Sequence, residues 1–237
     1  MSLAVNPELD LGAFAERLAT TGRAHIPEIL TQAAAERLRT ALERETPWSR
    51  SINIGGRGAD VPVDTFERFP PDQQHGLYQQ VWMEAERAFQ YLFDRFRITE
   101  TRAAGGPVPS ALMEADDFLN GPFLDFARRL TGRDEASFVD CQATRYVQGH
   151  FLTRHDDARE DHGRLYAYVL GLSREWRTDW GGLLQFLGPD GHVEEAFAPA
   201  FNSLNVFKVP ADHAVSIVAP FAGAPRLSIT GWIRSRR

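Results

Sequence analysis

The sequence predicts an α+β fold in which a double-stranded β-helix, or jelly roll, follows a set of buttressing helices. Residues 1–135 contain long segments with apolar residues at helical spacing, whereas the apolar runs after residue 136 are short and separated by turn-forming residues. A chain of 237 residues, 43% of them hydrophobic, is large enough to bury one full core. We therefore expect a single domain over residues 1–237, with mainly helical support in 1–135 and the jelly-roll core in 136–237.

Several helices are expected in the first part of the chain. Asp10 is a suitable N-cap for a helix over residues 11–18, because its side chain can accept a hydrogen bond from the first turn. A short strand over residues 23–27 should follow. Further helices are expected from residue 31, over residues 72–96, and over residues 110–130 with a break near residues 121 and 122.

The segment from Ser51 to Asp64 contains three glycines and few large apolar residues. Such a segment buries little surface, so we predict a mobile lid that becomes ordered when substrate binds. Arg50 and Arg57 would then contact the substrate. A rigid edge strand is the alternative.

The second part of the chain is interpreted as a series of strands. They are expected over residues 138–147, 150–155, 165–172, 183–187, 203–208, 214–218 and 226–233. Seven strands of this kind are consistent with a jelly roll. The only cysteine, Cys141, lies in the first of them and is interpreted as a buried, inert thiol.

His155 and Asp157 form a candidate metal-binding pair at the end of the second of these strands. On an extended chain, residues two apart point to the same side, so both side chains could bind one ion. His213, at the start of a later strand, could supply a third ligand. Two imidazoles and one carboxylate on one face suit Fe(II) and leave the opposite face open, with zinc as the main alternative. Asp156 competes with Asp157 if the chain is not extended there.

The last strand carries a candidate anion site. Alternation places Arg226, Ser228, Thr230 and Trp232 on one face of this strand. A guanidinium beside a hydroxyl is well suited to a carboxylate, because its planar fork donates two parallel hydrogen bonds.

The order of these residues resembles that of the prolyl 4-hydroxylase-type Fe(II)/2-oxoglutarate dioxygenases, in particular the bacterial relatives of the ribosomal-protein prolyl hydroxylases. The residues that carry the resemblance are Tyr146, Gly149, His155, Asp157, 181–186, 203–207, His213, Val215, Arg226, Ser228, Gly231 and Trp232. They occupy roughly the last hundred residues of the chain. Collagen-type members have Lys where this chain has Arg226, so the collagen substrate does not follow.

The resemblance implies a role for each matched position. Fe(II) would be bound by His155, Asp157 and His213, and the distal carboxylate of 2-oxoglutarate by Arg226 and Ser228, with Tyr146 reaching the same cosubstrate. The implied reaction uses O2, with ascorbate as a candidate reductant, and hydroxylates an unactivated C–H bond with release of succinate and CO2. The implied substrate is a prolyl residue in a protein or peptide.

Three other functions stay open at this point. The first is 2-oxoglutarate-dependent hydroxylation of a free amino acid or small metabolite, since one fold supports many substrates. The second is a cupin-like metal enzyme that does not use 2-oxoglutarate and has no need of Arg226. The third is a catalytically silent binding module, which would have no reason to keep both the ligands and the cation.

Composition and charge restrict the partners. Lys plus Arg is 26 and Asp plus Glu is 32, giving a net charge of −6, which does not favour nucleic acid or an anionic membrane. The N-terminus lacks a basic stretch before an apolar core, and no apolar run approaches the ~20 residues of a membrane helix. We therefore expect a cytoplasmic protein. His150, His162 and His192 lie in turn-like contexts and are expected to be exposed to solvent.

Overall fold

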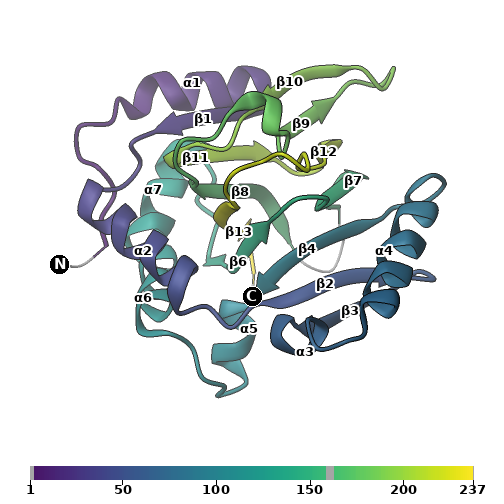
Figure 1. Cartoon of the computed structure of the whole chain (residues 1–237). Coiled ribbons are helices and arrows are strands. Elements are labelled where there is room, and N and C mark those ends of the chain that lie inside the picture. Colours follow the sequence, from purple (N-terminus) through teal and green to yellow (C-terminus); the bar gives the residue numbers. More distant parts are fainter. Residues whose placement is uncertain (1–2, 159–162, 237) are drawn as a thin grey trace.

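The computed structural model describes residues 3–158 and 163–236, and its strands form one antiparallel sheet that rolls into a nearly closed barrel (Figure 1). Hydrogen-bonded neighbours follow the order β1-β11-β8-β13-β6-β4-β7-β12-β9-β10, with β2, β3 and β5 attached at the side. This arrangement confirms the predicted jelly-roll type of α+β fold. The first strands are β1 (Arg23–Pro27), β2 (Ser49–Ile54), β3 (Arg57–Pro62), β4 (Tyr91–Phe96), β5 (Phe138–Val139), β6 (Gln142–Tyr146) and β7 (Phe151–His155). The later strands are β8 (Arg164–Leu172), β9 (Leu184–Leu187), β10 (Val193–Phe197), β11 (Phe201–Lys208), β12 (His213–Val215) and β13 (Arg226–Arg234).

Helices cover the outer face of the sheet, where they form the largest hydrophobic core. The helices are α1 (Leu11–Thr21), α2 (Gln32–Arg44), α3 (Val63–Phe66), α4 (Pro71–Ala85), α5 (Ile98–Ala103), α6 (Ser110–Leu119) and α7 (Pro122–Thr131). The alternation predicted for β13 is confirmed, because Leu227, Ile229 and Ile233 enter this core while Arg226 and Trp232 face the barrel interior. The predicted N-cap is also present, since the Asp10 carboxylate accepts a hydrogen bond from the amide of Ala13 at 3.3 Å.

Side chains connect β1 and β10, the two ends of the sheet. Arg23 donates to Glu194 at 3.0 Å and to Glu195 at 2.7 Å, and its guanidinium carbon lies 4.8 Å from the ring centroid of Phe186 on β9. Exposed strand edges are prone to pair with other chains. These contacts hold the two ends together without backbone pairing between them.

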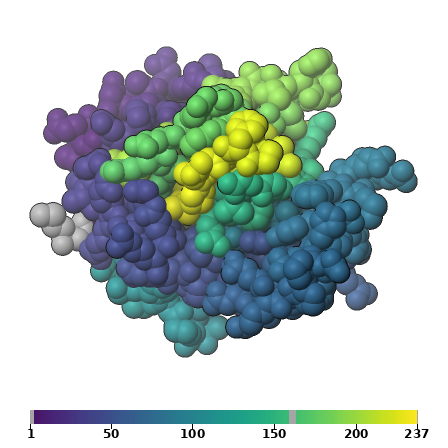
Figure 2. Space-filling model, viewed as in Figure 1, coloured from purple at the N-terminus to yellow at the C-terminus, as the bar shows by residue number. Residues whose placement is uncertain are grey.

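The helix predicted over residues 72–96 is wrong in its second half. The helix α4 ends at Ala85, and the chain re-enters as strand β4, which pairs with β2, β6 and β7. Phe89 and Phe93 fit a four-residue period, but together with Tyr91 they also fit the two-residue period of a strand. The pairing with distant strands decides between the two patterns. In Figure 2 this blue part of the chain lies beside the teal-green part that comes from the middle of the sequence.

Residues 51–64, for which a mobile lid is predicted, have regular secondary structure. They form most of a hairpin in which Ser51 of β2 pairs with Asp60 of β3, and β2 also pairs with β4. The proposed contact of Arg50 with substrate is wrong, because Arg50 is 7% exposed and ion-paired with Asp94. The response of the hairpin to substrate stays a prediction.

The strands also differ from the prediction at two places. The strand expected over residues 138–147 is divided into β5 and β6, because Asp140 turns its side chain back to the amide of Trp232 at 2.7 Å. Strand β10, rich in glutamate, was missed. Cys141 is buried as predicted, and burial raises the pKa of its thiol well above the usual value. Among the described residues, no helix is long and apolar enough to cross a membrane.

The expectation that His150 is exposed is wrong, since the residue is only 1% exposed. Burial lowers its pKa to about 4, although the Asp94 carboxylate nearby acts in the opposite direction. His192 is exposed as expected, and His162 lies outside the described residues.

We predict that the buried His150 destabilises the protein in acid. The unfolded chain binds a proton near pH 6.5 and the folded chain only near pH 4, so stability is complete above pH 6.5 and falls by about 3 kcal/mol as the pH drops to 4. Urea unfolding at several pH values should show that the stability difference between wild type and His150→Gln shrinks by this amount between pH 8 and pH 4. A constant difference would contradict the prediction.

Candidate active site

A cavity of about 520 Å³ lies inside the barrel and contains nearly all of the predicted site residues. Its walls are formed mainly by alternate residues of the strands, which is why polar and apolar side chains from distant parts of the sequence meet there. Of the predicted residues, those that line it are Tyr146, His155, Asp157, His213 and Arg226.

Two imidazoles face each other at the ends of neighbouring strands. His155 is the last residue of β7 and His213 the first of β12, and the two are directly paired across the sheet with ring centroids 4.1 Å apart. Each Nδ1 donates to a backbone carbonyl two residues earlier, that of Thr153 at 2.9 Å and that of Ala211 at 2.7 Å. These bonds leave both Nε2 atoms as acceptors, the form that binds metals.

Asp157 completes a three-residue cluster. Its Oδ1 lies 3.5 Å from Nε2 of His155 and its Oδ2 lies 3.5 Å from Nε2 of His213, and one ligand atom from each of the three residues lies within 4.8 Å of the others. The extended chain predicted at Asp157 is wrong: β7 ends at His155, and Asp157 has a φ of 61°. Asp156 is exposed, and its carboxylate accepts a hydrogen bond from the amide of Ala158 at 3.0 Å.

The electrostatics of the cluster suit a cation. Burial lowers the pKa of His213 to about 4, and the neighbouring imidazole of His155 contributes in the same direction. The imidazole of His213 is therefore neutral at physiological pH and free to act as a ligand. One carboxylate and two neutral imidazoles form the donor set that binds non-haem Fe(II).

A buried cation lies elsewhere in the same cavity. Arg226 is 4% exposed, stands opposite Tyr146 in the pairing of β13 with β6, and shares a side-chain hydrogen bond with it. Its guanidinium carbon lies 4.9 Å from the centre of the Tyr146 ring. Burial raises the pKa of Tyr146 to about 12, so the phenol stays neutral. Within the described residues, no carboxylate forms an ion pair with Arg226, and a buried charge of this kind requires an anionic partner.

Ser228 does not line the cavity. Its hydroxyl is buried and lies 2.7 Å from the hydroxyl of Thr144, and Thr144 is the residue exposed to the cavity. Thr144 was missed, although the alternation of its strand would have found it: Gln142, Thr144 and Tyr146 all point inward.

Aromatic rings line the cavity from its mouth inward. Phe89, which is 47% exposed, contacts both Tyr91 and His155, and Tyr91 contacts Phe93. Phe93 stacks on Tyr146 with ring centroids 5.1 Å apart. The row of rings extends from the three-residue cluster to Arg226 and makes this wall of the cavity apolar.

The sequence model of the 2OG-Fe(II) oxygenase superfamily matches residues 141–234, a segment that contains the three-residue cluster and Arg226. Through this segment the chain is similar to the 2OG-Fe(II) oxygenase superfamily. The resemblance identified from the sequence is thereby confirmed. The superfamily's use of Fe(II), 2-oxoglutarate and O2 also agrees with the cofactors expected from the sequence, while ascorbate stays a prediction.

Two curated proteins are similar to part of the chain. The chain is 33% identical over 117 residues to prolyl 3-hydroxylase OGFOD1 of Xenopus laevis, which covers 46% of this chain and 22% of that protein. The corresponding protein of Mus musculus is 32% identical over 117 residues. The chain therefore spans only about a fifth of the length of these relatives.

Solved structures share the fold over nearly the whole chain. A prolyl-4-hydroxylase of Pseudomonas putida superposes with a TM-score of 0.61 at 23% identity, covering 96% of this chain and 99% of the other. A prolyl hydroxylase of Trichoplax adhaerens, solved with a peptide fragment of hypoxia inducible factor, gives a TM-score of 0.60 at 19% identity, covering 95% and 89%. At these identities the similarity establishes the fold of the barrel.

Proposed function

We propose that this protein is an Fe(II)- and 2-oxoglutarate-dependent hydroxylase that acts on a prolyl residue in a protein or peptide. The observation that carries the proposal is the meeting of the His155, Asp157 and His213 cluster with the buried Arg226 in one cavity. The prolyl substrate is supported by the two curated relatives, both of which are prolyl 3-hydroxylases. The match to the superfamily removes the support for the cupin-like alternative.

Each part of the cavity has a role in this proposal. His155, Asp157 and His213 would hold Fe(II), and Arg226 with Tyr146 and Thr144 would bind the distal carboxylate of 2-oxoglutarate. When bound, the metal supplies the chemistry by which O2 and 2-oxoglutarate convert a C–H bond to C–OH, giving succinate and CO2. The apolar wall of Phe93 and Leu152 keeps water from the reacting groups.

Two further predictions belong to the same proposal. We propose that the partner is a proline-containing protein or peptide and that the protein acts in the cytoplasm. A single cysteine, buried and without a disulfide partner, is typical of a reducing compartment.

The proposal can be tested by mass spectrometry. Proline-containing peptides incubated with the protein, Fe(II), 2-oxoglutarate and ascorbate should gain one oxygen atom, which derives from 18O2 when that gas is supplied. Reactions without 2-oxoglutarate, and reactions with Asp157→Ala, should leave the peptides unchanged. Incorporation of oxygen into a small amino acid but into no peptide would overturn the prolyl assignment and favour a metabolite hydroxylase.

We predict that Arg226→Ala raises the concentration of 2-oxoglutarate needed for half-maximal turnover by about 10- to 150-fold. A charge-assisted hydrogen bond contributes ~1.5–3 kcal/mol to binding, which corresponds to this range. Ser228→Ala should have a smaller effect, because its hydroxyl acts through Thr144. Succinate formation measured against 2-oxoglutarate concentration, with Mn(II) affinity as the control, checks the prediction. An unchanged cosubstrate requirement would place the carboxylate site elsewhere.

A further inference from the structure

Asp157 adopts a left-handed backbone conformation, which is uncommon for residues other than glycine, although Asp tolerates it better than most. Its φ of 61° lies in the left-handed region, where a residue with a Cβ is less stable than in an extended or right-handed conformation. It also lies two residues beyond the end of β7 at His155, so no strand pairing supports it. Other contacts must hold the carboxylate between the two imidazoles.

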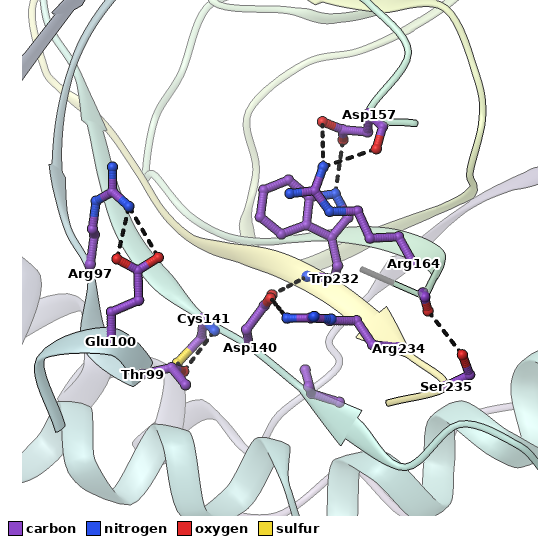
Figure 3. A network of polar contacts seen from close by, with 12 residues as sticks. Arg97, Thr99, Glu100, Asp140, Cys141, Asp157, Arg164, Trp232, Arg234 and Ser235 are labelled. Atoms are coloured by element: carbon purple, nitrogen blue, oxygen red, sulfur yellow. Dashed lines mark hydrogen bonds and ion pairs between the residues drawn. The ribbon is translucent and has the colours of Figure 1, made fainter. Parts of the chain in front are cut away.

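Two side chains make those contacts (Figure 3). Arg164, the first residue of β8, donates from Nη1 to the backbone carbonyl of Asp157 at 2.9 Å, and the same nitrogen lies 3.9 Å from Oδ1. Trp232 of β13 donates from its indole Nε1 to Oδ2 at 3.1 Å. The first contact fixes the backbone of Asp157, and the second fixes the orientation of its carboxylate.

Arg164 and Trp232 also support each other. The guanidinium carbon of Arg164 lies 3.5 Å from the centre of the Trp232 ring, which is a close cation–π contact. The side chain of Arg164 is only 12% exposed, so this contact is largely shielded from water. Both partners line the cavity.

The backbone of Trp232 is held by Asp140. Its backbone amide donates to Oδ1 of Asp140 at 2.7 Å, and the other carboxylate oxygen of Asp140 accepts from Arg234 at 3.1 Å (Figure 3). At the preceding position, a Cβ on Gly231 would lie 1.9 Å from the carbonyl oxygen of Asp140. Only glycine allows this approach. These contacts fix the backbone of Trp232 and therefore the position of the indole that donates to Asp157.

We propose that Arg164 and Trp232 are positioning residues that hold Asp157 in the orientation required for metal binding. The inference rests on the proposed function, in which Asp157 is a ligand, and assigns two residues that the ligand set does not include. Without these contacts, metal binding would also have to order the carboxylate. The free energy cost of that ordering would make the free energy of metal binding less favourable.

The test measures Mn(II) binding to the metal-free protein by titration calorimetry. Trp232→Phe keeps an aromatic ring beneath Arg164 and removes the indole donor, and it should weaken Mn(II) binding about 10- to 100-fold, the effect typical of a lost partner of a metal ligand. Arg164→Met should weaken binding to a similar degree. Because the two residues support each other, the double variant should lose less affinity than the two single losses combined.

Trp176→Phe is the matched control. Its indole Nε1 donates to the carbonyl of Gly181 at 2.9 Å, so the substitution removes the same kind of hydrogen bond at a position that does not contact Asp157. It should leave Mn(II) affinity unchanged. Thermal unfolding of each metal-free variant separates positioning from folding, since a purely structural role would lower the melting temperature without weakening the affinity of the folded protein.

Asp157→Ala separates failure of this inference from failure of the proposed function. If Asp157→Ala loses Mn(II) binding while Trp232→Phe and Arg164→Met bind as tightly as wild type, the positioning role is wrong and the ligand set stands. If Asp157→Ala itself binds like wild type, the ligand assignment is wrong. If Trp232→Phe does not fold, the comparison of Arg164→Met with Trp176→Phe decides the matter.

Discussion

Replacing His155, His213 or Asp157 by alanine should abolish Mn(II) binding and succinate formation while leaving the barrel folded. In the proposed site each residue would supply one of three ligand atoms, and cosubstrate and oxygen would take the remaining positions, so removal of one ligand would leave too few donors to retain the metal. The His155 and His213 side chains contact mainly each other, Asp157 and nearby aromatic rings. Their loss should therefore change the melting temperature of the metal-free protein only modestly.

Asp156→Ala is the natural control for this prediction. It removes a carboxylate from the adjacent position, but Asp156 is exposed and bonded to the amide of Ala158. We expect it to bind Mn(II) with nearly wild-type affinity. The opposite pattern, in which Asp156→Ala loses the metal and Asp157→Ala retains it, would show that the ligand assignment is off by one residue.

The grouping of the site residues could be predicted because strand alternation and motif order are local signals. His155, His213 and Arg226 each lie at the start or end of a strand, where the sequence itself indicates which face they occupy. The same alternation could have identified Thr144. What the sequence did not reveal was the conformation of Asp157, because its left-handed backbone depends on Arg164 and Trp232, which come from two other strands.

The errors in the predicted fold have a common physical origin. Phe89 and Phe93 satisfy both a helical and a strand period, and only the pairing of β4 with β2, β6 and β7 selects the strand. His150 follows a glycine in a turn, which suggests exposure, yet it is buried beside Asp94 and Arg145, residues 56 and 5 positions earlier in the chain. Contacts between distant segments decided both cases, and a local pattern carries no information about them.

Asp94→Ala should destabilise the protein by about 3–5 kcal/mol, the range found when one partner of a buried ion pair is removed. The Asp94 carboxylate is fully buried between two arginines that stand beside it on neighbouring strands. Arg50 donates to it at 2.7 Å, and Arg145 donates at 3.0 and 2.8 Å. Without the carboxylate, the two cations would face each other, and the side chain of Arg50 is only 9% exposed to water. Urea unfolding of both proteins at pH 7 measures the loss.

Asp60→Ala provides the matched control, because Asp60 also joins two arginines, Arg95 at 2.9 Å and Arg97 at 3.1 Å, but its side chain is 28% exposed. Partly hydrated pairs of this kind contribute about 1 kcal/mol or less. The stabilisation by Asp94 also depends on pH. Burial alone would raise the pKa of Asp94, but the hydrogen bond from Arg50 and the nearby positive charges lower it below its usual value. The stabilisation by Asp94 is therefore complete above about pH 4 and is lost as the pH falls through the lowered pKa. Equal losses in Asp94→Ala and Asp60→Ala at pH 7 would show that burial does not set the strength of this network.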